Sequence, residues 1–217
     1  MSMEASSCKC KSTPPGGRMG NMNRHAPCCS TVKYAILNTM DNSWTNDTLQ
    51  NKFCDRALRF SDISHVKAGR ITDTVIITHS MAGLVMSMAM ATGKCNFGKG
   101  STWVALSSPM TGSMASDYFQ DFCSDELNAA YVTAQKAYRE NSMMLVAADV
   151  IPHKSPQNDG LVEFQSCAKG LEKSKFGSSY KDTFYKPQLN HADTVFLTSD
   201  GWFKDSQKPA KWFECLL

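Results

Sequence analysis

From residue 31 onward, short apolar runs rich in β-branched residues alternate with longer segments that carry apolar residues at helical spacing. Such runs predict buried strands, and helical spacing predicts helices that pack against them. Strands that alternate with helices indicate a parallel sheet with right-handed crossovers. We therefore predict an α/β fold, with a mostly parallel sheet flanked by helices. The expected strands are residues 32–37, 73–78, 102–107 and 143–151, and the expected helices are residues 46–60, 81–92, 117–123 and 126–140.

Two of the expected helices carry recognisable end signals. Thr45 or Asn46 can cap the start of the first, and Gly93 follows the second at the position where helices often end. Residues 164–187 look rich in loops, and we expect residues 208–217 to form a short element at the edge of the fold.

The first 30 residues follow a different pattern from the rest of the chain. They contain prolines and glycines but no apolar periodicity, so we predict a disordered segment over residues 1–30 and a folded domain over residues 31–217. A zinc site in this segment is a weaker alternative, because adjacent Cys28 and Cys29 do not form the usual C-x2-C spacing. The residues that would take part are Cys8, Cys10, His25, Cys28 and Cys29.

The composition argues against two classes of protein, nucleic-acid-binding and membrane-spanning proteins. The 217 residues suit one domain with a real core, and a net charge of +3 spread along the chain does not suggest nucleic-acid binding. The longest nearly apolar run, residues 81–91, is far shorter than the roughly 20 residues that a membrane-spanning helix needs. We therefore predict neither a nucleic-acid partner nor a transmembrane segment, and the composition leaves the oligomeric state open.

The nine cysteines favour an oxidising compartment, and so an extracellular or secretory-pathway protein. Residues 1–20 lack the apolar core of a secretory signal, which suggests an incomplete or alternatively spliced start. We expect disulfides that bracket strand–helix units: Cys28 or Cys29 with Cys54, and Cys95 with Cys123. The sequon that begins at Asn46 is a candidate for glycosylation, which would also fit a secreted protein.

The sharpest chemical signal is the string THSMAG, residues 78–83, between an expected strand and an expected helix. A tight turn there exposes the hydroxyl of Ser80 and places the backbone N–H of Met81 at a helix N-terminus, where it can stabilise an oxyanion. Thr78 is larger than the glycine usual at its position. A serine in an ordinary strand-to-helix turn is the simpler alternative.

Two later positions complete the chain order serine, acid, histidine of one nucleophile-elbow fold. Asp159 lies in an Asn-Asp-Gly turn after the last expected strand, and His191 is the only histidine after residue 153. Either signal alone is ordinary turn or surface chemistry. His65, His153 and Asp149 are weaker alternatives for the base and the acid, and we expect His79 to be an orienting or packed residue.

The strings TVIITHSMAGLV, WVALSSPMTGS, NDGLVEFQSC and LNHAD resemble the α/β-hydrolase superfamily, and within it the secreted triacylglycerol-lipase-like group. The resemblance spans roughly residues 31–200. It implies Ser80 as nucleophile, Asp159 as acid and His191 as base, with Met81 in the oxyanion hole and no cofactor. Asp193 matches a position where some bacterial lipases place a calcium ligand, but no second carboxylate of such a site is evident.

The family also has an early strand and a His-Gly loop that gives the second oxyanion donor, and neither is evident here, so we expect a fold incomplete at the N-terminus. The expected function is a serine hydrolase that cleaves lipid or acyl carboxylic esters through an acyl-enzyme. A catalytically impaired or inactive hydrolase-like binding protein is the first alternative, and a cysteine-rich metal-binding module in residues 1–30 is the second.

Overall fold

The computed structural model describes residues 11–12, 19–37, 42–117 and 151–217. The chain divides into two compact units, which are described separately. Unit 1 comprises Met1–Ile36, Ser174–Leu189 and Asp193–Leu217, and unit 2 comprises Leu37–Lys173 and Asn190–Ala192.

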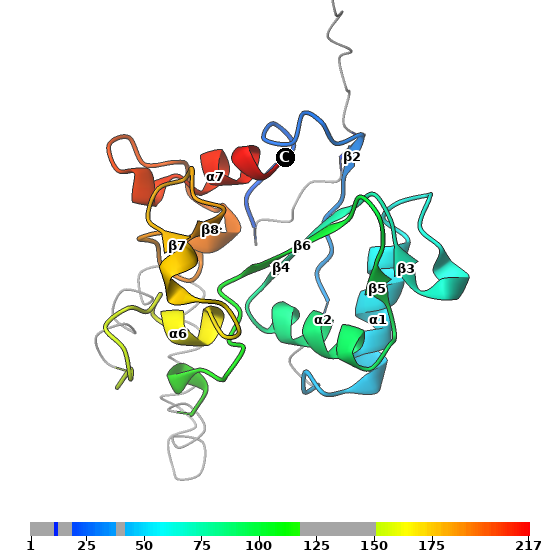
Figure 1. The fold of residues 1–217 in the computed structure, drawn as a ribbon, viewed down its shortest axis with the longest axis horizontal. Coiled ribbons are helices and arrows are strands. Elements are labelled where there is room, and N and C mark those ends of the chain that lie inside the picture. The colour runs from blue at the N-terminus through cyan, green and yellow to red at the C-terminus, as the bar shows by residue number, and fades with distance from the viewer. Residues whose placement is uncertain (1–10, 13–18, 38–41, 118–150) are drawn as a thin grey trace, which may run out of the picture. The chain divides into compact units, whose positions relative to one another are not determined.

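Unit 2 is built around a strand–helix–strand segment (Figure 1). Strand β4 (Val75–His79) leads into helix α2 (Met81–Ala91), and the chain returns through β6 (Thr102–Leu106), which pairs with β4 in parallel along its whole length. Side chains of β4 alternate between exposed and buried, as expected for a strand with one covered face. A second parallel pair joins β3 (Arg70–Ile71) to β5 (Asn96–Phe97).

Helix α1 (Asp47–Leu58) packs beside α2 and begins as the sequence predicts, because the side chain of Asn46 accepts a hydrogen bond from the N–H of Leu49. α2 also ends at the predicted place, with Gly93 in the left-handed region just after it. Their facing sides close the core of unit 2. Its buried members are Cys54, Ala57, Leu58, Ile71, Ile76, Met86, Ala89 and Cys95.

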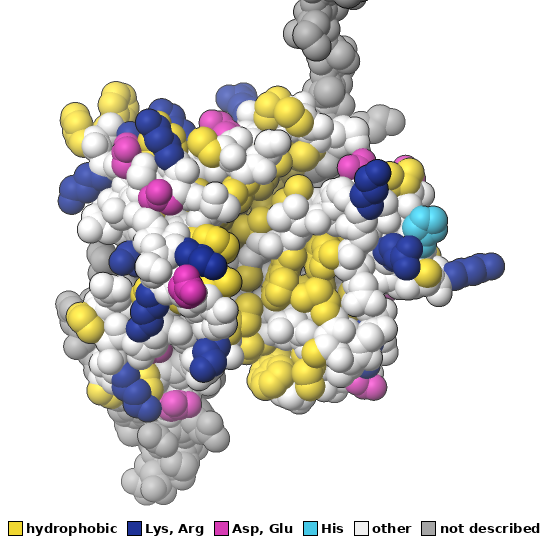
Figure 2. All heavy atoms as spheres, viewed as in Figure 1, with side chains coloured by type: hydrophobic (Ala, Val, Ile, Leu, Met, Phe, Trp, Pro, Cys, Tyr) yellow, Lys and Arg dark blue, Asp and Glu magenta, His cyan; other side chains and the backbone are white. Residues whose placement is uncertain are grey.

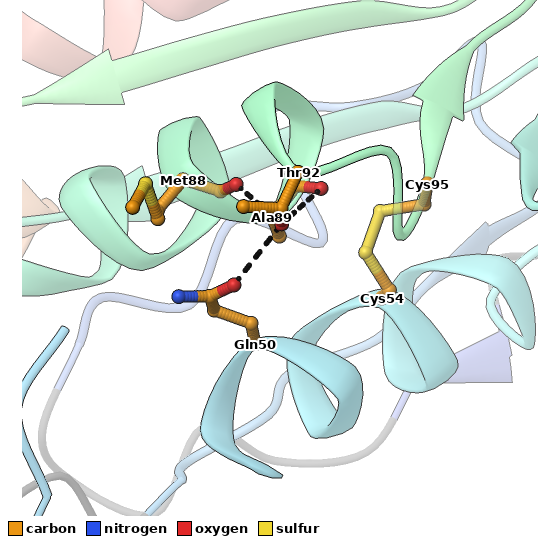
Figure 3. The surroundings of a disulfide bond; sticks show 6 residues. All are labelled: Gln50, Cys54, Met88, Ala89, Thr92 and Cys95. Atoms are coloured by element: carbon orange, nitrogen blue, oxygen red, sulfur yellow. Dashed lines mark hydrogen bonds between the residues drawn. A yellow bond between two sulfur atoms is a disulfide. The ribbon is translucent and has the colours of Figure 1, made fainter. Parts of the chain in front are cut away.

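A disulfide joins α1 to the segment that follows α2 (Figure 3). It links Cys54 of α1 to Cys95, which follows the end of α2, with 5.6 Å between their Cα atoms. Beside it, buried Gln50 accepts a hydrogen bond from the hydroxyl of Thr92. The predicted pairing of Cys54 with Cys28 or Cys29, and of Cys95 with Cys123, is therefore wrong. The contact between α1 and α2 brings Cys54 and Cys95 together instead; Cys123 lies outside the described residues.

Unit 1 is assembled from segments far apart in the sequence. Strands β1 (Lys11–Ser12) and β2 (Thr31–Val32) pair in parallel, as do β7 (Phe176–Gly177) and β8 (Phe184–Tyr185). Residues 19–30 pack here rather than forming the expected disordered tail, because they do supply apolar side chains. Met22 and Ala26 are buried, and Gly20 donates its N–H to the carbonyl of Val195.

The C-terminal segment is a helix, α7 (Pro209–Leu216), where the sequence predicted a short edge element. Pro209 suits the first helical position, since its ring presets φ and the N–H that it lacks would have no acceptor there. Residues 164–187 are rich in loops, as predicted, and hold only short elements of two to four residues. The remaining short helices are α6 (Phe164–Cys167) and four 3-10 turns, Val66–Ala68, Lys173–Lys175, Asp193–Val195 and Asp205–Gln207.

Helices with short parallel strands make this an α/β arrangement, and within the described ranges each sheet has two strands. The expected strand 32–37 is confirmed only at Val32, in β2. Most of the expected helix 117–123, the whole of the expected helix 126–140 and nearly all of the expected strand 143–151 lie outside the described residues. No described helix has the length and apolarity needed to cross a bilayer.

Candidate active site

Ser80 occupies a sharp turn between β4 and α2. Its backbone angles are φ 55° and ψ −132°, a conformation that side-chain-bearing residues seldom adopt and that costs about 1–3 kcal/mol. The turn is held from both sides: Ser80 donates its N–H to the carbonyl of Leu106 on β6, and its own carbonyl accepts from Gly83. Strain maintained by flanking hydrogen bonds is a feature of functional turns, and here it falls on the predicted nucleophile.

The turn requires a very close approach between α2 and the chain after β6. A Cβ atom at Gly83 would lie 2.0 Å from Oγ and 2.6 Å from Cβ of Ser108, so only glycine fits there. Thr78, the residue that departs from the usual glycine, fits for a different reason. It is buried, and its hydroxyl accepts a hydrogen bond of 2.9 Å from the indole of Trp103. The departure therefore leaves no unsatisfied polar group.

Met81 is the first residue of α2. Its N–H has no acceptor within the helix and lies at the positive end of the helix dipole. A backbone donor directly after the serine is the arrangement that an oxyanion hole uses. The structure confirms the predicted position of Met81, and its role as an oxyanion donor stays a prediction.

Asp159 is fixed by a tight turn that continues through Gly160, whose φ is 94°. One carboxylate oxygen accepts hydrogen bonds from the N–H groups of Leu161 (3.0 Å) and Val162 (2.8 Å). The other oxygen lies 2.8 Å from Nδ1 of His191. Burial alone would raise the pKa of Asp159, but the hydrogen bonds from His191, Val162 and Leu161 outweigh it, and its pKa is lowered. The group is therefore a carboxylate at neutral pH.

His191 is buried and is joined to Asp159 twice. Besides the side-chain contact, the N–H of His191 donates to the carbonyl of Asp159 at 2.8 Å. A carboxylate at Nδ1 fixes the tautomer in which Nδ1 carries the proton, so Nε2 holds the basic lone pair. The predicted acid and base, 32 residues apart in sequence, are thus in direct contact.

His79 connects the elbow to this pair. Its ring centre lies 4.4 Å from that of His191, and its Nε2 lies 3.0 Å from the carbonyl oxygen of His191, to which it donates. Burial, followed by the electrostatic interaction with the neighbouring imidazole of His191, lowers the pKa of His79 to about 3. A neutral His79 therefore orients the His191 loop, and Ser80 is the next residue along the chain.

The weaker candidates for the base and the acid lie in different surroundings or outside the described residues. His65 is exposed. His153 does have an acid partner, which sequence reasoning missed: its Nδ1 lies 2.6 Å from Oε1 of buried Glu163, and both side chains are about 4% exposed. Asp149 lies outside the described residues. Burial, with nearby Asp159 and Glu163, raises the pKa of Cys167 to about 12, which keeps that thiol protonated and unreactive.

The structure adds little to the predicted metal sites and the predicted glycosylation site. Among the described residues, no three His, Cys, Asp or Glu side chains gather as a metal site, and Asp193 begins a 3-10 turn. Cys8 and Cys10 of the weaker zinc alternative lie outside the described ranges. Asn46 serves as the cap of α1, and its glycosylation stays a prediction.

Comparison with known proteins adds no identification: no protein-family model, curated protein or solved structure matches this chain. The disulfide between Cys54 and Cys95 is compatible with an extracellular protein.

Proposed function

We propose that the protein is a serine hydrolase of the α/β-hydrolase kind, which cleaves carboxylic esters of lipids or other acyl compounds. The observation that carries the proposal is the contact between Asp159 and Nδ1 of His191, in a unit that also holds Ser80 in a strained strand-to-helix turn. A buried carboxylate on an imidazole fixes its tautomer and stabilises the imidazolium that forms during proton transfer.

The reaction has two halves. Oγ of Ser80 attacks the ester carbonyl carbon while Nε2 of His191 takes the serine proton, and the negative charge that develops on the carbonyl oxygen faces the N–H of Met81. The alcohol leaves with the proton from His191, which gives an acyl ester on Ser80. Water then attacks this ester, His191 removes its proton, and the carboxylic acid is released. No cofactor is required.

A fluorophosphonate probe tests the proposal without knowledge of the natural ester. The wild-type protein should be labelled at Ser80, because labelling needs an activated hydroxyl and an oxyanion donor. Ser80→Ala and His191→Ala should abolish labelling, and Asp159→Asn should slow it, by up to about 10⁴-fold if the acid acts as in serine proteases. Peptide mass spectrometry locates the adduct.

The matched control is Ser87→Ala, which removes another serine of α2 and should label at the wild-type rate. Circular dichroism shows whether each variant folds. Modification of Ser107, Ser108 or Ser113 in place of Ser80 would overturn the nucleophile assignment. A folded wild-type protein that remains unlabelled would instead favour a non-catalytic, hydrolase-like binding protein.

A further inference from the structure

Two adjacent aromatic side chains in unit 1 are almost fully exposed. Trp202 is 91% and Phe203 96% exposed, far more than the other large apolar side chains of the described chain. They lie in the loop that precedes α7, a region where Figure 2 shows hydrophobic side chains protruding beside basic and acidic ones. Exposed apolar groups that cluster in this way mark interaction sites more often than isolated ones do.

The base of this loop is tightly held. Gly201 donates its N–H to the carbonyl of Gln207, and a Cβ atom at Gly201 would lie 2.8 Å from Cβ of Gln207, so the two ends of the loop approach closely. The carboxylate of Asp200 accepts from the N–H groups of Ala210 (2.8 Å) and Lys211 (3.1 Å), which ties the loop to the first turn of α7. Hydrogen bonds therefore hold both ends of the loop that carries Trp202 and Phe203.

Several lysines lie near the loop. Lys204 directly follows Phe203, and three further lysines lie about the ring of Tyr180, at 5.3–5.9 Å from its centre to each Nζ. The acidic residues of the loop are locally engaged: Asp200 by the two backbone donors, and Asp205 by Nζ of Lys208 at 2.8 Å. The lysines that remain for an anionic surface are Lys181, Lys204 and Lys211, because the charge of Lys208 is paired with that of Asp205.

We propose that this loop, the Trp202 loop (residues 200–207), binds the surface of a bilayer that contains anionic phospholipids. Tryptophan and phenylalanine partition into the boundary between headgroups and acyl chains, and lysines within a few ångströms of the surface are attracted by anionic headgroups. A lipid surface can bind a protruding loop without a groove in the protein. The exposed aromatic pair and the neighbouring lysines of the Trp202 loop fit this mode of binding. The inference deepens the proposed function, on which it rests, by placing a lipid-ester hydrolase at the phase that holds its substrate.

Vesicle co-sedimentation of the full chain tests this. The vesicles are made of ether-linked lipids, which contain no carboxylic ester to hydrolyse, with phosphatidylcholine and phosphatidylserine headgroups in equal parts or with phosphatidylcholine alone. The wild-type protein should bind the anionic vesicles more tightly. The double variant Trp202→Ser with Phe203→Ser should lose at least about tenfold in the partition constant, and Lys204→Gln about fivefold on anionic vesicles only.

The matched control replaces Ile63 and Val66, which are 58% and 52% exposed in unit 2, by serine and should bind as the wild type does. The proposal is overturned if the wild type binds neither vesicle, if the control loses as much as the Trp202 variant, or if the aromatic pair instead supports a dimer in analytical ultracentrifugation. Fluorophosphonate labelling is measured on the same samples. Labelling without vesicle binding refutes this inference alone, and binding without labelling refutes the hydrolase proposal alone.

Discussion

At the scale of single residues, Thr78 shows how a departure from a sequence pattern can be structurally harmless. A strand-to-helix elbow needs small residues because the strand and helix approach closely, yet Thr78 is buried there, and its hydroxyl accepts from Trp103, so it adds no unsatisfied polar group. The closest approach falls instead at Gly83, against Ser108. The sequence correctly predicted that the turn around Ser80 needs a small residue. Which position makes the tightest contact depends on the chain that follows β6.

Gly83→Ala should therefore destabilise unit 2 and slow labelling of Ser80, because the new methyl group would overlap the buried side chain of Ser108. We expect a loss of about 1–3 kcal/mol in the free energy of unfolding, typical of overpacking. Thermal or urea unfolding measures the loss. Adding Ser108→Gly should recover part of it, and a double variant no better than Gly83→Ala would contradict the contact.

His79 gives a prediction for the dependence of stability on pH. Its pKa in the folded protein is about 3, whereas an unfolded histidine protonates near pH 6.5. Below that pH the unfolded chain binds a proton that the folded chain does not, so stability is complete above about pH 6.5 and falls as the pH is lowered toward 3. From pH 7 to pH 5 the loss from this residue should be about 1–2 kcal/mol.

Urea unfolding at several pH values measures this loss. His79→Phe should give a shallower fall, since phenylalanine binds no proton. His65→Phe removes an exposed histidine and should leave the wild-type slope. Equal slopes in all three proteins would show that His79 is not held neutral.

At the scale of elements, the packing of α1 against α2 determines the disulfide. In the chain-entropy account, closing a loop across 41 positions contributes about 4 kcal/mol, which in a protein of this size corresponds to roughly 10 °C in the melting temperature. We expect the double variant Cys54→Ser with Cys95→Ser to melt lower by this order. Calorimetry with and without reductant provides the check.

Reductant should lower the melting temperature of the wild type but not that of the double variant. Cys28→Ser is the control, because Cys28 is exposed and its sulfur belongs to no disulfide. A similar loss in that control would mean that thiol chemistry elsewhere determines the melting temperature.

At the scale of the whole molecule, local signals and the strand pairing within one strand–helix–strand segment were predictable, whereas most contacts between distant elements were not. The cap at Asn46, the glycine after α2 and the parallel pairing of β4 with β6 all depend on short stretches of sequence. The cysteine pairing and the packing of Met22 depend on which distant elements meet. His191 was predicted as the candidate base only because the chain order serine, acid, histidine is that of one nucleophile-elbow fold.

The proposed site depends on contacts between residues far apart in the chain. Residues 190–192 belong to unit 2, but the segments on either side of them belong to unit 1, and the contact between His79 and His191 spans 112 positions. During synthesis on the ribosome, the serine and the acid emerge well before the imidazole that, in the proposed mechanism, activates the serine. A chain interrupted anywhere between residues 160 and 190 would hold Ser80 and Asp159 but not His191, so under the proposed mechanism the growing polypeptide could not hydrolyse an ester before its last eighth is made.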